Sequence, residues 1–266
     1  MAERFVYHGN ATILTGHVHR PSDVWLDVGG VSSLPVSGGT SSATLARQDF
    51  GGVVAFESAS THAQGVPHEV TSRRRGAYDE PVSQAHTGAE VRGLQVGTGR
   101  LRLTAARLRA ELMALCPCHA TQPSIGAMDG ASVEGVAFGG HRLTVAIDRR
   151  FFKDHDTHDK LCEACLRQGR RTRRAVGFTP IAAGETNPAA LHTTIVKSLR
   201  WNGRPFPKAT IDGHVVTIPK FGRVFFGELT VTGPTRRLTM VRFALDGDVV
   251  VEGACCEVEA GGTWRH

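Results

Sequence analysis

Cysteine and histidine side chains carry the clearest chemical signal in this sequence. Four cysteines form two closely spaced pairs, Cys116 with Cys118 and Cys162 with Cys165. Thiolates and imidazoles are the ligands that tetrahedral zinc prefers, and the C-x-x-C spacing of the second pair is common among zinc sites. Three histidines near these pairs are further candidate ligands: His119, His155 and His158.

A zinc site requires the chain to bring the two pairs together. Residues 151–190 are charged, rich in Cys, His and Arg, and poor in strand patterns. A bound ion would order such a segment, because metal-binding free energy becomes folding free energy. However, the C-x-C spacing of Cys116 and Cys118 is less typical than a second C-x-x-C. Disulfides joining the same two segments, or free thiols, therefore remain open alternatives.

The other candidate groups point to less specific chemistry. Cys255 and Cys256 are adjacent, and neighbouring side chains on a strand face opposite sides, so we expect one buried and one exposed thiol. The arginine run 170–174 offers the clustered positive charge that a nucleic-acid backbone needs, but Phe178 is the only aromatic residue close to it. Nucleic-acid binding is therefore the less favoured interpretation of this run.

No motif in the chain predicts an enzyme. The sequence contains no G-x-S-x-G, no H-E-x-x-H and no phosphate-binding loop. Carboxylates such as Glu228 and Glu257 fall on expected strands, and nothing in the pattern pairs them for acid–base work. The residue types therefore favour a non-enzymatic protein.

The elements that would position these residues are mostly β-strands. Short runs of alternating apolar residues are separated throughout by Gly, Asn, Asp and Pro. Three segments repeat one scheme, in which two strands flank a glycine turn, at residues 51–52, 97–99 and 139–140. This weak repeat predicts stacked hairpins. The last block predicts four strands in an antiparallel meander or Greek key: Val215–Pro219, Arg223–Thr232, Arg237–Leu245 and Val249–Val258.

The fold class that follows is all-β. We expect an antiparallel sandwich of jelly-roll-like form, with a β-solenoid of stacked hairpins as the alternative. Leu101–Leu115 is rich in helix formers, but the repeat favours a strand there, with a bulge near Ala105 and Ala106 where the alternation changes parity. Residues 64–88 predict a long exposed loop, and Asp159–Arg167 a short helix.

Length and composition limit the remaining possibilities. The chain has 266 residues, 31 of them glycine, and a formal net charge of +6. This length fits one β-rich domain over residues 1–266, with the strand-poor insertion at about 151–190. No stretch approaches the roughly 20 apolar residues of a membrane span, and the first residues lack the apolar core of a signal peptide.

The glycine-punctuated pattern resembles a bacterial family. The segments "VSSLPVSGGTSSATLARQDFGGVVAFESAS", "AEVRGLQVGTGRLRLTAARLRAELMALC" and "SVEGVAFGGHRLTV" carry the resemblance, which covers about residues 10–258. They are similar to secreted proteins of the choice-of-anchor type, which are β-rich and largely uncharacterised. The resemblance implies a location outside the cell, with the cytoplasm as the alternative, and it supplies no catalytic residues.

Together these observations favour a structural or interaction protein that self-assembles as a homo-oligomer through edge strands, because an open edge is a template for pairing. The first alternative is a metal- or ligand-binding module, with or without enzyme activity, that uses the four cysteines and zinc as its cofactor. The second is a nucleic-acid-binding protein that uses the arginine runs.

Overall fold

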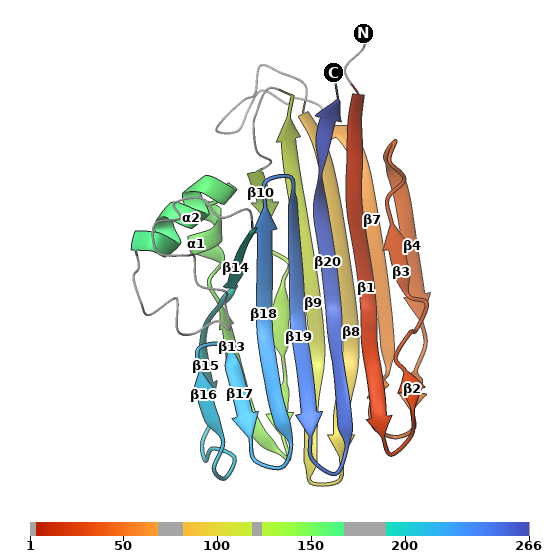
Figure 1. Ribbon diagram of the computed structural model, residues 1–266, viewed down its shortest axis with the longest axis vertical. Coiled ribbons are helices and arrows are strands. Elements are labelled where there is room, and N and C mark those ends of the chain that lie inside the picture. Colours follow the sequence, from red (N-terminus) through yellow and green to blue (C-terminus); the bar gives the residue numbers. More distant parts are fainter. Residues whose placement is uncertain (1–3, 69–81, 119–123, 168–189, 266) are drawn as a thin grey trace.

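The computed structural model describes residues 4–68, 82–118, 124–167 and 190–265 (Figure 1). Its strands form two antiparallel sheets, which we name sheet 1 and sheet 2. Sheet 1 has nine strands: β1 (Arg4–Arg20), β2 (Val24–Trp25), β3 (Val31–Ser33), β14 (Ala190–Thr194), β16 (Thr210–Asp212), β17 (Val215–Ile218), β18 (Gly222–Thr232), β19 (Thr235–Asp246) and β20 (Val250–Arg265).

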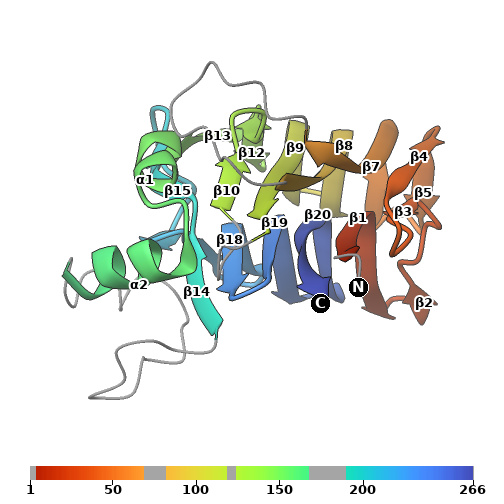
Figure 2. The same cartoon turned by 90° about the horizontal axis from the view of Figure 1, so that it is seen from above.

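Sheet 2 lies face to face with sheet 1, as the view from above shows (Figure 2). It has eleven strands: β4 (Gly39–Leu45), β5 (Gln48–Phe50), β6 (Val54–Phe56), β7 (Ser58–His68), β8 (Val82–Thr98), β9 (Leu101–Pro117), β10 (Ser124–Ala127), β11 (Ser132–Glu134), β12 (Val136–Phe138), β13 (His141–Ile147) and β15 (Val196–Trp201). The predicted all-β antiparallel sandwich is confirmed, and the described chain forms two facing layers rather than the coils of a solenoid.

The two sheets differ in how their strands follow one another. In sheet 1, β17, β18, β19 and β20 are neighbours in chain order, so the last block is the predicted meander. β20 then pairs along its length with β1, from Arg4 opposite Arg265 to Arg20 opposite Val250. The first and last described strands are therefore neighbours, and beyond β1 the described part of sheet 1 has only the short strands β2 and β3.

The core fills the space between the two layers. Each long strand turns Val, Leu, Ile, Phe or Ala side chains inward, and these form one connected cluster. Leu108 and Leu112 of β9 and Phe226 and Phe243 of sheet 1 are fully buried within it. Burial of each such side chain contributes roughly 1.5–3 kcal/mol to folding, so this cluster is the main source of stability.

Strand β9 confirms the strand interpretation of residues 101–115. Its buried residues are odd-numbered up to Ala105 and even-numbered from Leu108 to Cys116, so the inward face changes parity, as expected, near Ala106. The β8–β9 ladder keeps one register throughout, but Gly93 and Ala106 form no pair in it. The two unpaired residues lie opposite each other. Neither strand therefore has an extra residue, as it would have in an ordinary β-bulge.

Positions like Gly93 and Ala106, where two neighbouring strands lack a pair, form a row that crosses both sheets. We name it the parity row. In sheet 1 the inward face changes parity along each strand at these unpaired positions: Ile13, Gly227, Met240 and Cys256. Gly227 has φ 61° and Cys256 has φ 54°, while Gly93 and Gly135 of sheet 2 have φ 65° and 64°. A left-handed residue reverses the side on which the next side chains emerge, so the strands can keep burying apolar residues beyond the row.

The parity row overturns one expectation about the adjacent cysteines. Cys255 and Cys256 are both buried, at 1% and 0% exposure, rather than one facing solvent. The left-handed backbone at Cys256 breaks the strict alternation and places both side chains on the inner side of sheet 1. The Cys256 Sγ lies 3.5 Å from the carbonyl oxygen of Leu108 in sheet 2 and donates to it across the core.

The loop expected at residues 64–88 is wrong at both ends. β7 extends to His68 and β8 starts at Val82, and the two strands pair as far as His68 opposite Val82. Small residues such as Ala63 and Ala85 supply their buried face, which makes the alternation hard to recognise. Residues 69–81 lie outside the described chain.

Two short helices lie beside β14 and β15 at one side of the sandwich (Figure 2). They are α1 (Arg149–Asp154) and α2 (His158–Arg167), and α2 confirms the predicted helix at Asp159–Arg167. The rest of the expected insertion, residues 168–189, lies outside the described chain. Among the helices of the described residues, none is long and apolar enough to cross a bilayer.

The parity row predicts an unequal cost for two glycine substitutions. In Gly227→Ala the new Cβ would lie 2.6 Å from Ile195 Cγ1 at a left-handed φ. We expect this variant to lose about 1–3 kcal/mol of unfolding free energy, measured by urea denaturation. Gly233→Ala is the matched control, because its Cβ would meet nothing within 4 Å. Equal stability of the two variants would contradict the role given to the row.

Candidate functional site

The four predicted zinc ligands lie in two separate elements. Cys116 is near the end of β9 and Cys118 follows that strand, whereas Cys162 and Cys165 lie in α2. Cys116, Cys118 and Cys162 are almost completely buried. The Trp264 indole donates a hydrogen bond of 3.0 Å to the Cys116 carbonyl oxygen, so β20 holds the end of β9 in place.

The surroundings of these thiols keep them protonated. Burial raises the pKa of Cys116 to about 12, although the charge of Arg236 opposes the rise. Burial also raises the pKa of Cys162 and of Cys165 to about 11. Thiolates are the reactive and metal-binding form of cysteine, so these groups are poor nucleophiles at neutral pH.

The described histidines of the predicted site have other partners. His155 Nδ1 lies 2.8 Å from the Phe151 carbonyl oxygen, and His158 Nε2 lies 3.6 Å from the Cys162 Sγ. His119 lies outside the described chain. Across residues 4–68, 82–118, 124–167 and 190–265, no three His, Cys, Asp or Glu side chains are placed to hold a metal ion, and all six cysteines are free thiols. Zinc or disulfide use of the four cysteines stays a prediction.

A polar cluster that the sequence does not reveal lies on the outer face of sheet 1. Arg242 donates two hydrogen bonds to Glu228, of 2.6 and 2.8 Å, and its guanidinium lies 3.6 Å from the ring centre of Phe225. His214 Nε2, whose side chain is fully buried, is 3.6 Å from Glu228 Oε1. Phe225 and Glu228 share this face because the parity row passes between them at Gly227.

The charges of this cluster hold Glu228 ionised. Burial alone would raise the pKa of Glu228, but the hydrogen bonds and positive charges of Arg242 and His214 outweigh it and lower the pKa to about 2. A carboxylate with so low a pKa is a weak general base and stays without a proton at neutral pH. The cluster therefore stabilises the sheet rather than moving protons.

A second cluster lies on the outer face of sheet 2. His62 of β7 and Glu111 of β9 are both opposite Gly88 of β8, which leaves room for the His62 ring. The rings of His62 and His86 are 5.0 Å apart, and His86 Nε2 is 3.2 Å from Glu111 Oε1. Burial and the neighbouring charge of His86 lower the pKa of His62. Arg109 donates to Glu111 at 2.7 Å, so the carboxylate has two basic neighbours.

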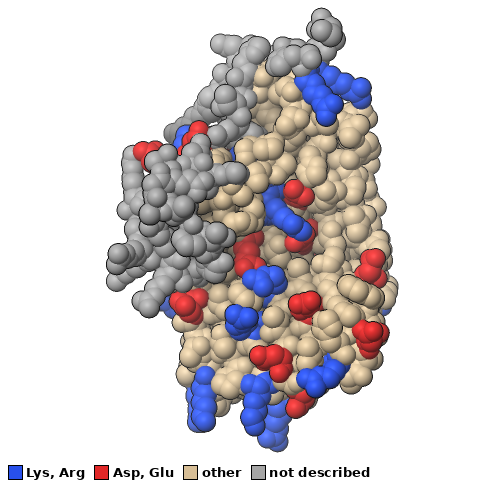
Figure 3. Space-filling view, in the orientation of Figure 1, with Lys and Arg blue, Asp and Glu red and all other residues tan. Residues whose placement is uncertain are grey.

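Both outer faces are therefore covered by cross-strand ion pairs. The space-filling view of one side shows positive and negative side chains interspersed on it, with more positive ones gathered at the lower end (Figure 3). Neither cluster combines a nucleophile with an activating base, and neither forms a field of one sign. Their arrangement fits solvated sheet faces.

The open edge of sheet 2 is a different kind of feature. Within the described chain, β4 pairs only with β7, so its other side has no partner strand. The sequence Gly39–Leu45 has no charge and no proline. Three exposed large apolar residues come from the chain just before β4: Trp25 at 72%, Val31 at 48% and Val36 at 60% exposure.

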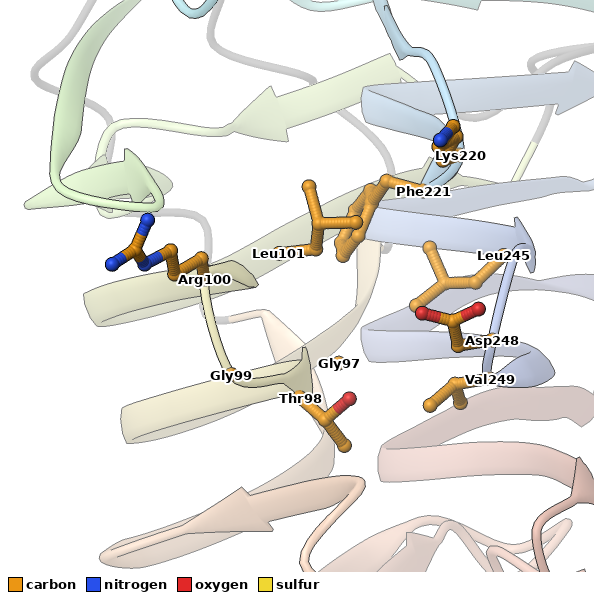
Figure 4. Close-up of a pocket in the computed structure, with 10 residues that line it drawn as sticks. All are labelled: Gly97, Thr98, Gly99, Arg100, Leu101, Lys220, Phe221, Leu245, Asp248 and Val249. Carbon is orange, nitrogen blue, oxygen red and sulfur yellow. The ribbon is translucent and has the colours of Figure 1, made fainter.

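A cavity of about 300 Å³ opens at the hairpin end of the sandwich. It lies between the β8–β9 turn of sheet 2 and the β17–β18 and β19–β20 turns of sheet 1 (Figure 4). Phe221, Leu245, Val249 and Leu101 supply its apolar lining, with the Leu101 side chain beside the Phe221 ring (Figure 4). The guanidinium of Arg100 points away from the other labelled residues (Figure 4).

These features define an antiparallel all-β sandwich with ion-paired outer faces and one uncharged edge. A family described as a domain of unknown function (DUF8256) matches residues 5–172 and, in a second match, residues 156–232. The first match covers more than half of the chain, and the chain belongs to this family. No curated protein and no solved structure matches it with significance.

The ionised state of Glu228 predicts a loss of stability in acid. A carboxylate whose pKa is lowered by folding contributes stability above its unfolded pKa of about 4.5, and this contribution is lost as the pH falls toward about 2. Glu228→Gln should therefore lower the unfolding free energy at pH 7 by on the order of 2 kcal/mol and flatten its decrease between pH 5 and pH 2.

Chemical denaturation at a series of pH values measures both effects. Glu252→Gln is the control, because the Glu252 carboxylate is 71% exposed and the His19 Nε2 that it faces is 3.7 Å away. An unchanged acid profile in Glu228→Gln would show that the ion pair contributes no net stability.

Proposed function

We propose that this protein is a non-enzymatic structural or interaction protein that self-associates through β4. The observation that carries the proposal is the seven-residue, uncharged, proline-free edge that β4 presents. The unpaired N–H and C=O groups of such an edge form a template for another strand, and proteins that stay monomeric usually block it.

Three other edge strands of the described chain carry such blocks. β15 has Lys197 and Arg200 exposed along its length, β16 has only three residues and includes Asp212, and β5 includes Asp49. Beside β14, Ile195 binds the two sheets together: its N–H donates to the Gly227 carbonyl and its carbonyl accepts from Asp148 N–H, both at 2.8 Å. β4 is the longest of these edge strands, and it has no charged residue that would block pairing.

The sequence of β4 supports a second copy of the chain as its partner. A two-fold antiparallel pairing centred on Ser42 would place Thr40 opposite Thr44 and Ser41 opposite Ala43. Small and hydroxyl-bearing residues would then face their own kind, which suits cross-strand packing and Thr–Thr hydrogen bonds. Such an interface is isologous and closes at a dimer.

Exposed apolar residues lie close to this edge. Val31 belongs to β3, which packs beside β4, and Val36 lies between β3 and β4, whereas Trp25 lies on β2 and stacks on His17 of β1. A second copy seated on β4 would remove part of this apolar surface from water, which adds a hydrophobic contribution to the backbone pairing. A location outside the cell stays the prediction that the sequence makes for this assembly.

Ser42→Lys tests the pairing. It would place two like charges directly opposite each other at the centre of the interface, so we expect the dimer to dissociate to monomers at micromolar concentration. Light scattering coupled to size-exclusion chromatography measures the mass. Thr15→Lys, which adds the same charge to an exposed position of β1, should leave the mass unchanged.

Ser42→Cys gives a positive test of the register. Facing Cβ atoms in an antiparallel pair are about 4.5–5.5 Å apart, so mild oxidation should link two chains at this position but not in a Thr15→Cys variant. A wild-type protein that stays monomeric at high concentration, or a dimer that Ser42→Lys leaves intact, would refute pairing through β4.

A further inference from the structure

The cavity at the hairpin end combines apolar walls with two opposite charges. Phe221, Leu245 and Val249 are held in place by the core, with exposures of 4%, 4% and 9%. Lys220 and Asp248 also line the cavity, from two different turns of sheet 1. In the described part of the chain, neither of these two charged groups forms an ion pair, so both are available to a ligand.

Lys220 has a left-handed backbone conformation, which glycine or asparagine adopts more easily than lysine. The Phe221 N–H donates to the Ile218 carbonyl at 3.1 Å, which closes a four-residue turn with Pro219 second and Lys220 third. Lys220 has φ 64°, and Gly or Asn is preferred at the third position of a turn with Pro second and positive φ third. A strained residue held at the rim of a cavity is a candidate for a functional role.

The packing of the facing turn keeps this conformation in place. A Cβ at Gly247 would lie 2.0 Å from the Lys220 carbonyl oxygen, so the two turns lie in close contact. The Asp246 N–H also donates to the Phe221 carbonyl at 3.2 Å. The positions of Lys220 and Asp248 are therefore fixed relative to each other by the backbone of sheet 1.

We propose that this cavity binds a small zwitterion with an apolar side chain, the chemistry of a free apolar α-amino acid such as leucine. The ligand carboxylate pairs with the Lys220 ammonium, its ammonium pairs with the Asp248 carboxylate, and its side chain lies against Phe221 and Leu245. The volume of about 300 Å³ is at the small end of ligand pockets, which suits a small ligand. The site lies apart from β4, so this proposal does not depend on self-association.

Isothermal titration calorimetry with the full chain tests the ligand class. We expect leucine to bind, and three analogues to bind at least about tenfold more weakly, because each lacks one of the recognised groups. The analogues are 4-methylpentanoate without the ammonium, 3-methylbutylamine without the carboxylate, and glycine without the apolar side chain. An analogue that binds as well as leucine would overturn the role of the group that it lacks.

Two variants assign the charges. Lys220→Gly removes the cation and relieves the left-handed strain, so its unfolding temperature should not fall, while its leucine affinity should fall at least about tenfold. Asp248→Asn should weaken leucine by a similar factor and leave 4-methylpentanoate unchanged.

Lys208→Gly is a matched control for the first variant. Lys208 has φ 60° and follows Pro207 in a turn closed by the Ala209 N–H and the Phe206 carbonyl, but it does not line the cavity. It should gain the same relief of strain and keep leucine affinity. No detectable leucine binding to the wild type, or equal affinity in Lys220→Gly and Lys208→Gly, would overturn the proposal.

Discussion

Two facing sheets share one dry core only if every long strand presents its apolar side chains inward along its whole length. In this protein β7 does so with a single parity, but six other long strands do not. β1, β8, β9, β18, β19 and β20 all change parity at one level, and because they change together the core continues across the row. The cost is a left-handed backbone at Gly93, Gly135, Gly227 and Cys256, which glycine accepts at three of the four positions. The cluster on the outer face of sheet 1 depends on the same constraint. Phe225 and Glu228 lie on one face of β18, where both contact Arg242, only because Gly227 lies between Phe225 and Glu228.

The sequence predicts the class of this fold well and the extent of its strands less well. Glycine turns and alternating Val and Leu identify the hairpins, and the change of parity at Ala106 is visible in the sequence itself. The ends of β7 and β8 are hidden because small residues such as Ala63 and Ala85 supply the buried face there, and alternation of small with polar residues resembles a loop. The pairing of distant strands cannot be predicted from the sequence either, since nothing local in β1 indicates that its partner is β20, more than 200 residues later.

The candidate sites show the same limit. Cysteine spacing draws attention to Cys116, Cys118, Cys162 and Cys165, yet burial and the raised pKa of these thiols depend on contacts that spacing does not encode. The ion pair between Glu228 and Arg242 joins residues that a regular strand pattern would not align. Lys220 looks like an ordinary surface residue in the sequence, and only its backbone angle and its place beside the cavity distinguish it. The edge at β4 is different, because its lack of charge and proline is already visible in the residues Gly39–Leu45.

The pairing of β1 with β20 has a consequence for how the chain reaches its native state. β1 ends at Arg20 and β20 begins at Val250, so the β1–β20 ladder of sheet 1 stays incomplete until the long segment between them has been synthesised. Contacts between such distant segments form slowly, because closing a long loop costs entropy before the ladder forms. During that interval β1 exposes an apolar face and an unpaired backbone, which are the features that chaperones protect in nascent chains.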